Sequence, residues 1–172
     1  MILPIVKYGA SILRKKAFEI DKGDDFQNLA NNMMATLKQS EGIGLAGPQV
    51  ACAKNIFIID TTPLAADGVA PIEKVYINPE ILHFGDHPVY YNEGCLSIPD
   101  IYEDVLRPDS IMVRYRDINF DLREETLNDI VARIFQHEYG HLQGILFVDR
   151  INGIRKRLLR GKLRRIERSS FR

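Results

Sequence analysis

Two histidines spaced four residues apart place the strongest constraint on how this chain folds. His137 and His141 belong to the run His-Glu-Tyr-Gly-His. On an α-helix, residues i and i+4 lie on one face, so both imidazoles can bind the same metal ion. Glu138 lies one position round the helix and can reach a metal-bound water without being a ligand. The pattern predicts a metal-dependent hydrolase; the alternative is a pair of ordinary histidines on an amphipathic helix.

The flanking sequence predicts the helix that this motif requires. From Thr126 onward, apolar residues recur with a period close to 3.6, at Leu127, Ile130, Val131, Ile134 and Phe135. Gly144, two residues after Leu142, is typical of a helix end.

The rest of the chain indicates one earlier helix and several short strands. Residues 24–40 have apolar positions at helical spacing and begin with an aspartate, which predicts a helix. Segments rich in β-branched and aromatic residues predict strands at 55–60, 74–78, 88–91 and 111–115, with a hairpin turn at 117–119. Residues 61–71, with two prolines and a glycine, are predicted to be a mobile loop. This order favours an α+β domain with antiparallel sheet over alternating βαβ units.

The composition is that of a single soluble globular domain. The 172 residues are 45% hydrophobic and 27% charged, enough to bury a core and enclose a small site. No stretch approaches the roughly 20 apolar residues of a membrane span, and the N-terminus lacks the pattern of a secretory signal, so we expect a cytoplasmic protein without membrane contact. Cys52 and Cys95 could form one disulfide, but in a reducing cytoplasm a cysteine within a motif is more often a ligand or nucleophile.

Charge is distributed unevenly, although the net charge is zero. Residues 151–172 contain nine Lys or Arg and one Glu, a balance of +8, so residues 1–150 carry −8. Apolar residues at roughly helical spacing make the basic segment a predicted amphipathic helix, which could contact RNA phosphates or pack back on the body. We expect residues 1–150 to form a catalytic metal-hydrolase domain, with 151–172 as part of that domain or as a tether.

Gly42, Gly44 and Gly47 satisfy the dinucleotide-binding pattern GxGxxG. That motif binds a pyrophosphate only after a strand and before a helix, whereas here the predicted helix comes first. We therefore expect no nucleotide cofactor, and we interpret the glycines as a loop whose backbone passes close to a ligand or a metal site.

Two histidines leave a tetrahedral site one protein ligand short, with a fourth position for water. In the longer HExxHxxGxxH pattern, the third histidine would stand at Phe147, so that pattern fails. The one glutamate after the motif is Glu167, which lies among arginines, while His83 and His87 flank a Gly-Asp turn typical of a surface. Cys95 is the remaining candidate.

Three stretches together resemble the signature motifs of the peptide deformylases: Gly-Ile-Gly-Leu-Ala-Gly-Pro-Gln at 42–49, Glu-Gly-Cys-Leu-Ser at 93–97 and Gln-His-Glu-Tyr-Gly-His at 136–141. The likeness runs from Leu3 to Asp149. It implies that Cys95 is the third ligand beside His137 and His141. It also implies small antiparallel or mixed sheets packed around the central motif helix, with a further helix at the C-terminus.

The resemblance implies a reaction as well. The enzyme would remove the formyl group of formylmethionyl nascent peptides, using one divalent metal ion; ferrous iron would be natural, and zinc, nickel or cobalt also accepted. Glu138 would move the proton, while the Gln49 side-chain amide and the Leu96 backbone N–H would bind the oxyanion. The implied substrate-binding residues are Ile43, Gly44, Glu93, Gly94, Ile130, Arg133 and Ile134.

Two positions depart from the family pattern. Gly140 stands where the family usually has Asp, so a carboxylate is missing behind the ligands, and we expect Arg107 to lack its partner. Arg133, one turn before His137, stands where the methionine pocket tends to be apolar. We expect its aliphatic stem to form a pocket wall and its charge to point to solvent, which would make the rim more polar than usual.

Two other functions stay open at this point. A zinc peptidase could use Glu167 as its third ligand. A catalytically weakened homologue, with its site loosened at Gly140, could bind RNA through residues 151–172. In an active deformylase the same segment would contact the ribosome, because the C-terminal helices of this family resemble such a tether.

Overall fold

The structure is a computed structural model that describes residues 1–169; the last three residues of the predicted basic helix, 170–172, lie outside the described residues. The α-helices are α1 (Phe26–Gln39), α2 (Asp129–Leu142) and α3 (Gly153–Ser169). The strands are β1 (Gly44–Ala46), β2 (Ile56–Asp60), β3 (Glu73–Phe84), β4 (Pro88–Cys95), β5 (Ile98–Pro108), β6 (Ser110–Arg116) and β7 (Leu122–Asn128). Short 3-10 helices are η1 (Ser11–Arg14), η2 (Gly47–Val50), η3 (Thr62–Asp67) and η4 (Phe147–Asp149).

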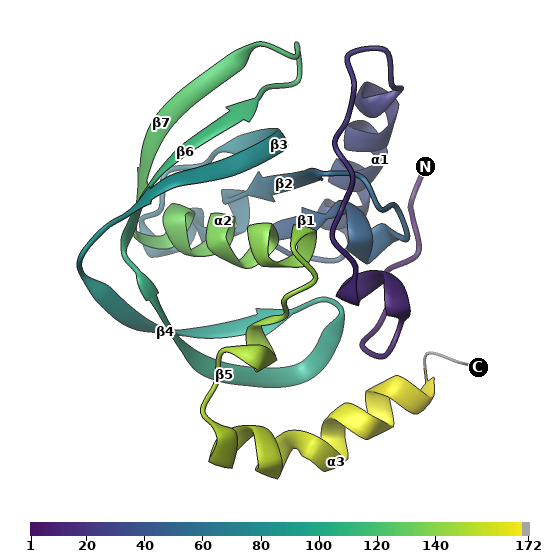
Figure 1. Cartoon of the computed structure of the whole chain (residues 1–172), viewed down its shortest axis with the longest axis vertical. Helices are drawn as coiled ribbons and strands as arrows, with labels where there is room; N and C mark the ends of the chain where they lie inside the picture. Colours follow the sequence, from purple (N-terminus) through teal and green to yellow (C-terminus); the bar gives the residue numbers. More distant parts are fainter. Residues whose placement is uncertain (170–172) are drawn as a thin grey trace.

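Two antiparallel sheets lie on either side of α2. Five strands pair in the order β1-β2-β3-β6-β7, and β4 pairs with β5 in a separate hairpin. Figure 1 shows α2 between this hairpin and the larger sheet. The predicted α+β class, with sheets around the motif helix and a further helix at the C-terminus, is confirmed.

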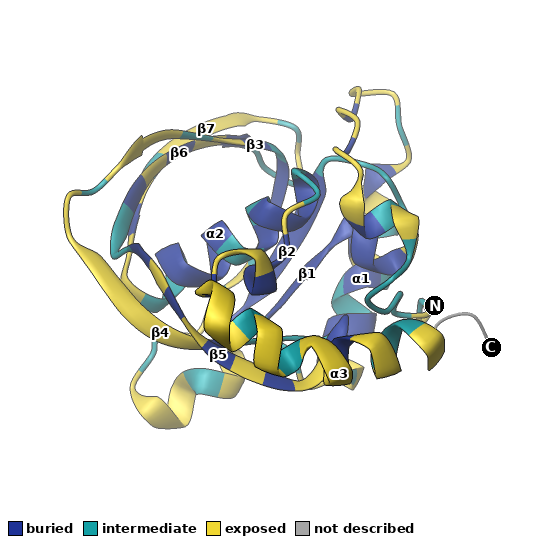
Figure 2. Ribbon diagram, turned by 60° about the horizontal axis from the view of Figure 1, so that its bottom comes forward, coloured by how far each residue is buried: buried dark blue, intermediate teal, exposed yellow. Residues whose placement is uncertain are grey.

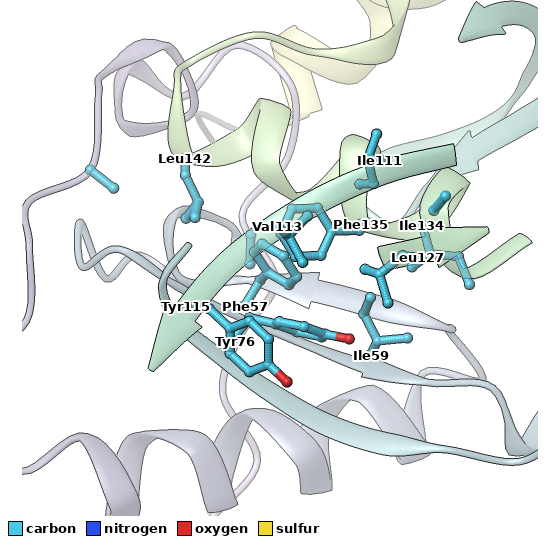
Figure 3. Close-up of a cluster of buried hydrophobic side chains, with 13 residues drawn as sticks. Phe57, Ile59, Tyr76, Ile111, Val113, Tyr115, Leu127, Ile134, Phe135 and Leu142 are labelled. Atoms are coloured by element: carbon cyan, nitrogen blue, oxygen red, sulfur yellow. The ribbon is translucent and has the colours of Figure 1, made fainter. Parts of the chain in front are cut away.

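Strand β2 is buried along its whole length and apolar from Ile56 to Ile59, because both of its faces are covered. Phe57 and Ile59 point toward α2, in the cluster drawn in Figure 3, where Phe57 meets Phe135 edge to face with ring centroids 4.9 Å apart. The alternating residues Ile56 and Ile58 pack in a second cluster together with residues of α1. The motif helix is thus fixed against a rigid, fully buried strand.

Most predicted elements are present, and their limits differ in instructive places. The predicted helix at 24–40 is α1, with Asp25 as its N-cap, and the predicted strands correspond to β2, β3, β4 and β6, with Asn55 alone outside its strand. The predicted start of the motif helix at Thr126 is wrong, because 126–128 pair with β6 as the end of β7 and α2 begins at Asp129. The segment 61–71 is not wholly irregular, since it contains η3.

The basic segment forms α3, and its apolar side packs on the body. Leu163 is 5% exposed and belongs to a third core cluster with Val148 and Ile151, while Leu159 and Ile166 are partly buried against it. The remaining face of α3 is exposed, as Figure 2 shows. Within residues 1–169, no helix combines the length and apolar content needed to cross a membrane.

Candidate metal centre

Three potential metal ligands converge where α2 meets the end of β4. One nitrogen from each of His137 and His141 and the sulfur of Cys95 all lie within 4.8 Å of one another. The Cys95 Sγ is 3.3 Å from His141 Nε2, and neither Cys95 nor Cys52 is in a disulfide. One thiolate and two imidazoles suit a single divalent transition metal. The helix supplies the two histidines by their i, i+4 spacing, and the hairpin supplies the cysteine.

Glu93 fixes the orientation of His137. Its Oε2 lies 2.9 Å from His137 Nδ1, so the other ring nitrogen is left to face the ligand group. Arg107 donates to both carboxylate oxygens of Glu93, at 2.7 and 2.8 Å. Burial alone would raise the pKa of Glu93, but the hydrogen bonds from Arg107 and His137 lower it well below its ordinary value. Glu93 is therefore a buried carboxylate that is held ionised.

Burial also sets the protonation of the second histidine. Desolvation lowers the pKa of His141 well below its ordinary value, and the nearby His137 adds to this effect. The imidazole of His141 is therefore neutral at physiological pH, which is the form that binds a metal.

The carboxyl group of Glu138 is buried beside the ligands. Glu138 is 4% exposed, and its Oε2 accepts no hydrogen bond from residues 1–169. Burial raises the pKa of Glu138 to about 7, close to the value that suits a general base at neutral pH. The Gly44 backbone runs directly against this side chain, since a Cβ at Gly44 would lie 2.4 Å from Glu138 Oε1. The backbone here passes close to the side chain beside the ligands, but the predicted loop is wrong, because Gly44 begins strand β1 and Gly47 begins η2.

Gln49 reaches the same centre from η2. Its Oε1 accepts a hydrogen bond from the Ala46 N–H at 2.8 Å, which turns the amide nitrogen toward Cys95 Sγ at 3.5 Å and Ser97 Oγ at 3.2 Å. Leu96 follows Cys95 directly, and its carbonyl accepts a hydrogen bond from Lys7 Nζ at 2.8 Å. The Gln49 amide is thus a fixed hydrogen-bond donor beside the ligands, and Leu96 directly follows one of them in the chain.

A cleft of about 510 Å³ opens at this centre. Its lining includes all the predicted substrate-binding residues together with other predicted site residues: Ile43, Gly44, Gln49, Glu93, Gly94, Cys95, Leu96, Ile130, Arg133, Ile134, His137 and Glu138. The remaining predicted ligand, His141, is 1% exposed and lies beneath the lining. Sequence reasoning missed Lys7, Tyr91 and Tyr102, which also line the cleft. Of these, Tyr91 could have been found from the sequence. It lies in a predicted strand two residues before Glu93, and alternate residues of a strand point to the same face.

Two predictions about arginines near the site are wrong. Arg107 does not lack a partner, because Glu93 accepts its bidentate hydrogen bonds. Arg133 lines the cleft but does not turn its charge to solvent. It is 6% exposed, and its guanidinium donates to Glu93 Oε1 and to the backbone carbonyls of Val89 and Val105. Three acceptors, two of them buried, are thus available to it within the protein, so the outward orientation offers no advantage.

The zinc peptidase alternative is contradicted by the position of Glu167. This residue lies against Gly9 and is outside the group of ligands that the described residues form. His83 and His87 are exposed, as expected. Gly140 is buried in α2, where the Ile145 carbonyl lies 2.9 Å from the position of a Cβ atom.

Comparison with known proteins gives a consistent result. The family model described as polypeptide deformylase matches residues 2–157. A peptide deformylase of Christiangramia forsetii is 41% identical, over 99% of this chain and 92% of that protein, and one of Cytophaga hutchinsonii is 42% identical, over 98% and 92%.

Solved structures agree with the sequence relatives. A crystal structure of a plant peptide deformylase superposes with a TM-score of 0.89 at 38% identity, covering 97% of this chain and 90% of that one. A peptide deformylase of Thermotoga maritima gives 0.80 at 35% identity, covering 88% and 99%. Its sequence, its fold and its Cys-His-His group show that this chain belongs to the polypeptide deformylase family.

Proposed function

We propose that the chain hydrolyses the N-terminal formyl group of formylmethionyl peptides, with Cys95, His137 and His141 holding one divalent metal ion. The observation that carries this proposal is the convergence of these three ligands with the buried Glu138 carboxylate in one cleft. When bound, such an ion lowers the pKa of water and polarises a carbonyl group.

Glu138 is the proposed proton carrier. It takes a proton from the attacking water, whose oxygen adds to the formyl carbon, and it returns a proton to the amine nitrogen as the carbon–nitrogen bond breaks. The products are formate and a peptide with a free N-terminal methionine. A pKa of about 7 lets the carboxyl group both accept and donate near neutral pH.

Gln49 and Leu96 are the proposed donors to the developing oxyanion. The Ala46 N–H holds the Gln49 side chain in one orientation, so its amide nitrogen needs no reorganisation when negative charge forms. The cleft would take the methionine side chain between the apolar residues Ile43, Ile130 and Ile134.

Formate release from a formylmethionyl peptide tests the proposal directly. Metal-loaded protein is expected to release formate, and a chelator to stop it. Cys95→Ser is expected to lose the metal, whereas Glu138→Gln should keep the metal and lose turnover; Glu167→Gln, away from the ligand group, is the matched control. If metal-loaded protein releases no formate but binds RNA with steep salt dependence, the weakened RNA-binding homologue is the better account.

We propose ferrous iron as the native ion because the family resemblance implies it. A Cys-His-His set also accepts zinc, nickel or cobalt, and the ligands alone do not select among them. Metal analysis of protein prepared without oxygen decides this. Zinc with negligible iron in such a preparation would contradict the proposal.

We also propose that α3 contacts the ribosome, in the cytoplasm where formylated chains emerge. The exposed arginines Arg157, Arg160 and Arg164 offer charge to RNA phosphates. A triple Arg→Glu variant should lose co-sedimentation with ribosomes while keeping activity on a free peptide. Unchanged co-sedimentation would exclude this contact.

A further inference from the structure

Arg133 connects the two elements that carry the metal ligands. It lies on α2, one turn before His137, and the acceptors of its guanidinium lie on the opposite hairpin. Val89 and Glu93 belong to β4, which also carries Cys95, and Val105 belongs to β5. Figure 1 shows α2 directly facing this hairpin.

Charge neutralisation does not explain this arginine. Glu93 is already paired with Arg107 through two hydrogen bonds, so its single negative charge has a cation without Arg133. Arg133 instead adds a second donor to Oε1, at 2.9 Å, while the other oxygen also accepts from His137. A planar, forked donor that meets three acceptors fixes distances between chain segments, which a point charge does not do.

Resting on the metal site proposed above, we propose that Arg133 is a positioning residue for the metal centre. It holds the β4–β5 hairpin against α2, and so sets the position of Cys95 relative to the two histidines. Through Glu93 it also holds the ring of His137 in the orientation that a ligand requires. The guanidinium carbon lies 5.8 Å from the centre of the Tyr91 ring, so the same side chain supports that wall of the cleft.

Metal retention gives a readout that is independent of turnover. Cobalt-loaded protein has a thiolate-to-cobalt absorption band, and its decay in excess chelator measures the dissociation rate. Arg133→Met is expected to raise this rate roughly 10-fold or more, the size typical for partners of metal ligands. Arg133→Lys keeps the charge but lacks the fork, and is also expected to dissociate several-fold faster than wild type. Arg114→Met removes a different arginine, which lies on β6 and pairs with the glutamate Glu124, and this variant should behave as wild type.

Each outcome decides the proposal. An unchanged dissociation rate in Arg133→Met, even with a lowered melting temperature, would mean that Arg133 only stabilises the fold and would overturn it. A wild-type rate in Arg133→Lys would overturn it too, because charge alone would then suffice. If Arg133→Met does not fold, Arg133→Lys alone decides by the same criterion. Failure of wild-type protein to release formate would instead refute the proposed function. The metal dissociation rates would still be valid, because they are measured without turnover.

Discussion

The contact between Gly44 and Glu138 makes a sharp prediction for catalysis. A Cβ atom at Gly44 would lie 2.4 Å from Glu138 Oε1, 2.8 Å from Cδ and 2.9 Å from Cγ. An ordinary contact begins near 3.4 Å, so Gly44→Ala must move the carboxylate oxygen by about 1 Å. The oxygen is the end of a flexible side chain, so the carboxylate moves more readily than the backbone does.

A displacement of that size at a proton-transferring group is expected to lower kcat/KM by roughly 100-fold, about 2.7 kcal/mol in the activation free energy. The three metal ligands are not touched, so metal content should equal that of wild type. The assay is formate release under metal saturation, with metal content measured on the same samples.

Gly161→Ala is the matched control, because Gly161 is exposed on α3 and a Cβ there meets nothing within 4 Å. It should keep full activity. If Gly44→Ala keeps wild-type kcat/KM, then Glu138 can act from a shifted position, and the geometric account of its role is wrong. If Gly44→Ala loses its metal, the effect lies in the ligands rather than in the base.

Three further predictions concern stability. Burial alone would raise the pKa of Asp149, but hydrogen bonds led by that from Arg14 lower it, so its contribution is present above pH 4 and lost as pH falls through the lowered pKa. Asp149→Asn should therefore cost about 1 kcal/mol in urea unfolding at pH 7 and less at pH 3. Gly140→Ala should not give the gain of up to about 1 kcal/mol typical of helix interiors, because the Ile145 carbonyl must move; a raised melting temperature would contradict this. Deleting residues 151–172 should lower the melting temperature clearly, and an unchanged one would show an independent tether.

The parts of the site that depend on local spacing could be predicted from sequence. The i, i+4 relation of His137 and His141 and the position of Glu138 follow from helix geometry alone. The third ligand could not be obtained in this way, because Cys95 reaches the histidines only through the packing of the hairpin on α2. Reasoning from residues left Cys95 and Glu167 open, and the family resemblance decided between them.

Strand β5, which the sequence did not predict, and the misplaced arginine have one physical cause. The inward face of β5 carries Glu103 and Arg107 beside Ile101 and Val105, so the usual alternation of apolar and polar residues is hidden. Charged residues are buried there because partners from distant segments satisfy them. Arg133 was expected to face solvent for the same reason: its acceptors lie far away in sequence.

Helix α3 is also held by partners from a distant segment, through contacts of its inner face with the body. Glu103 is 7% exposed, and its two oxygens accept hydrogen bonds from Arg155 of α3 at 2.8 and 3.0 Å. Without α3, this carboxylate would lose its charged partner and Leu163 would leave the third core cluster. The inner face of α3 therefore belongs to the folded body, and its basic outer face is presented on a rigid support. Ribosome contact should accordingly be tested by charge reversal on the outer face, since deletion would change stability and charge together.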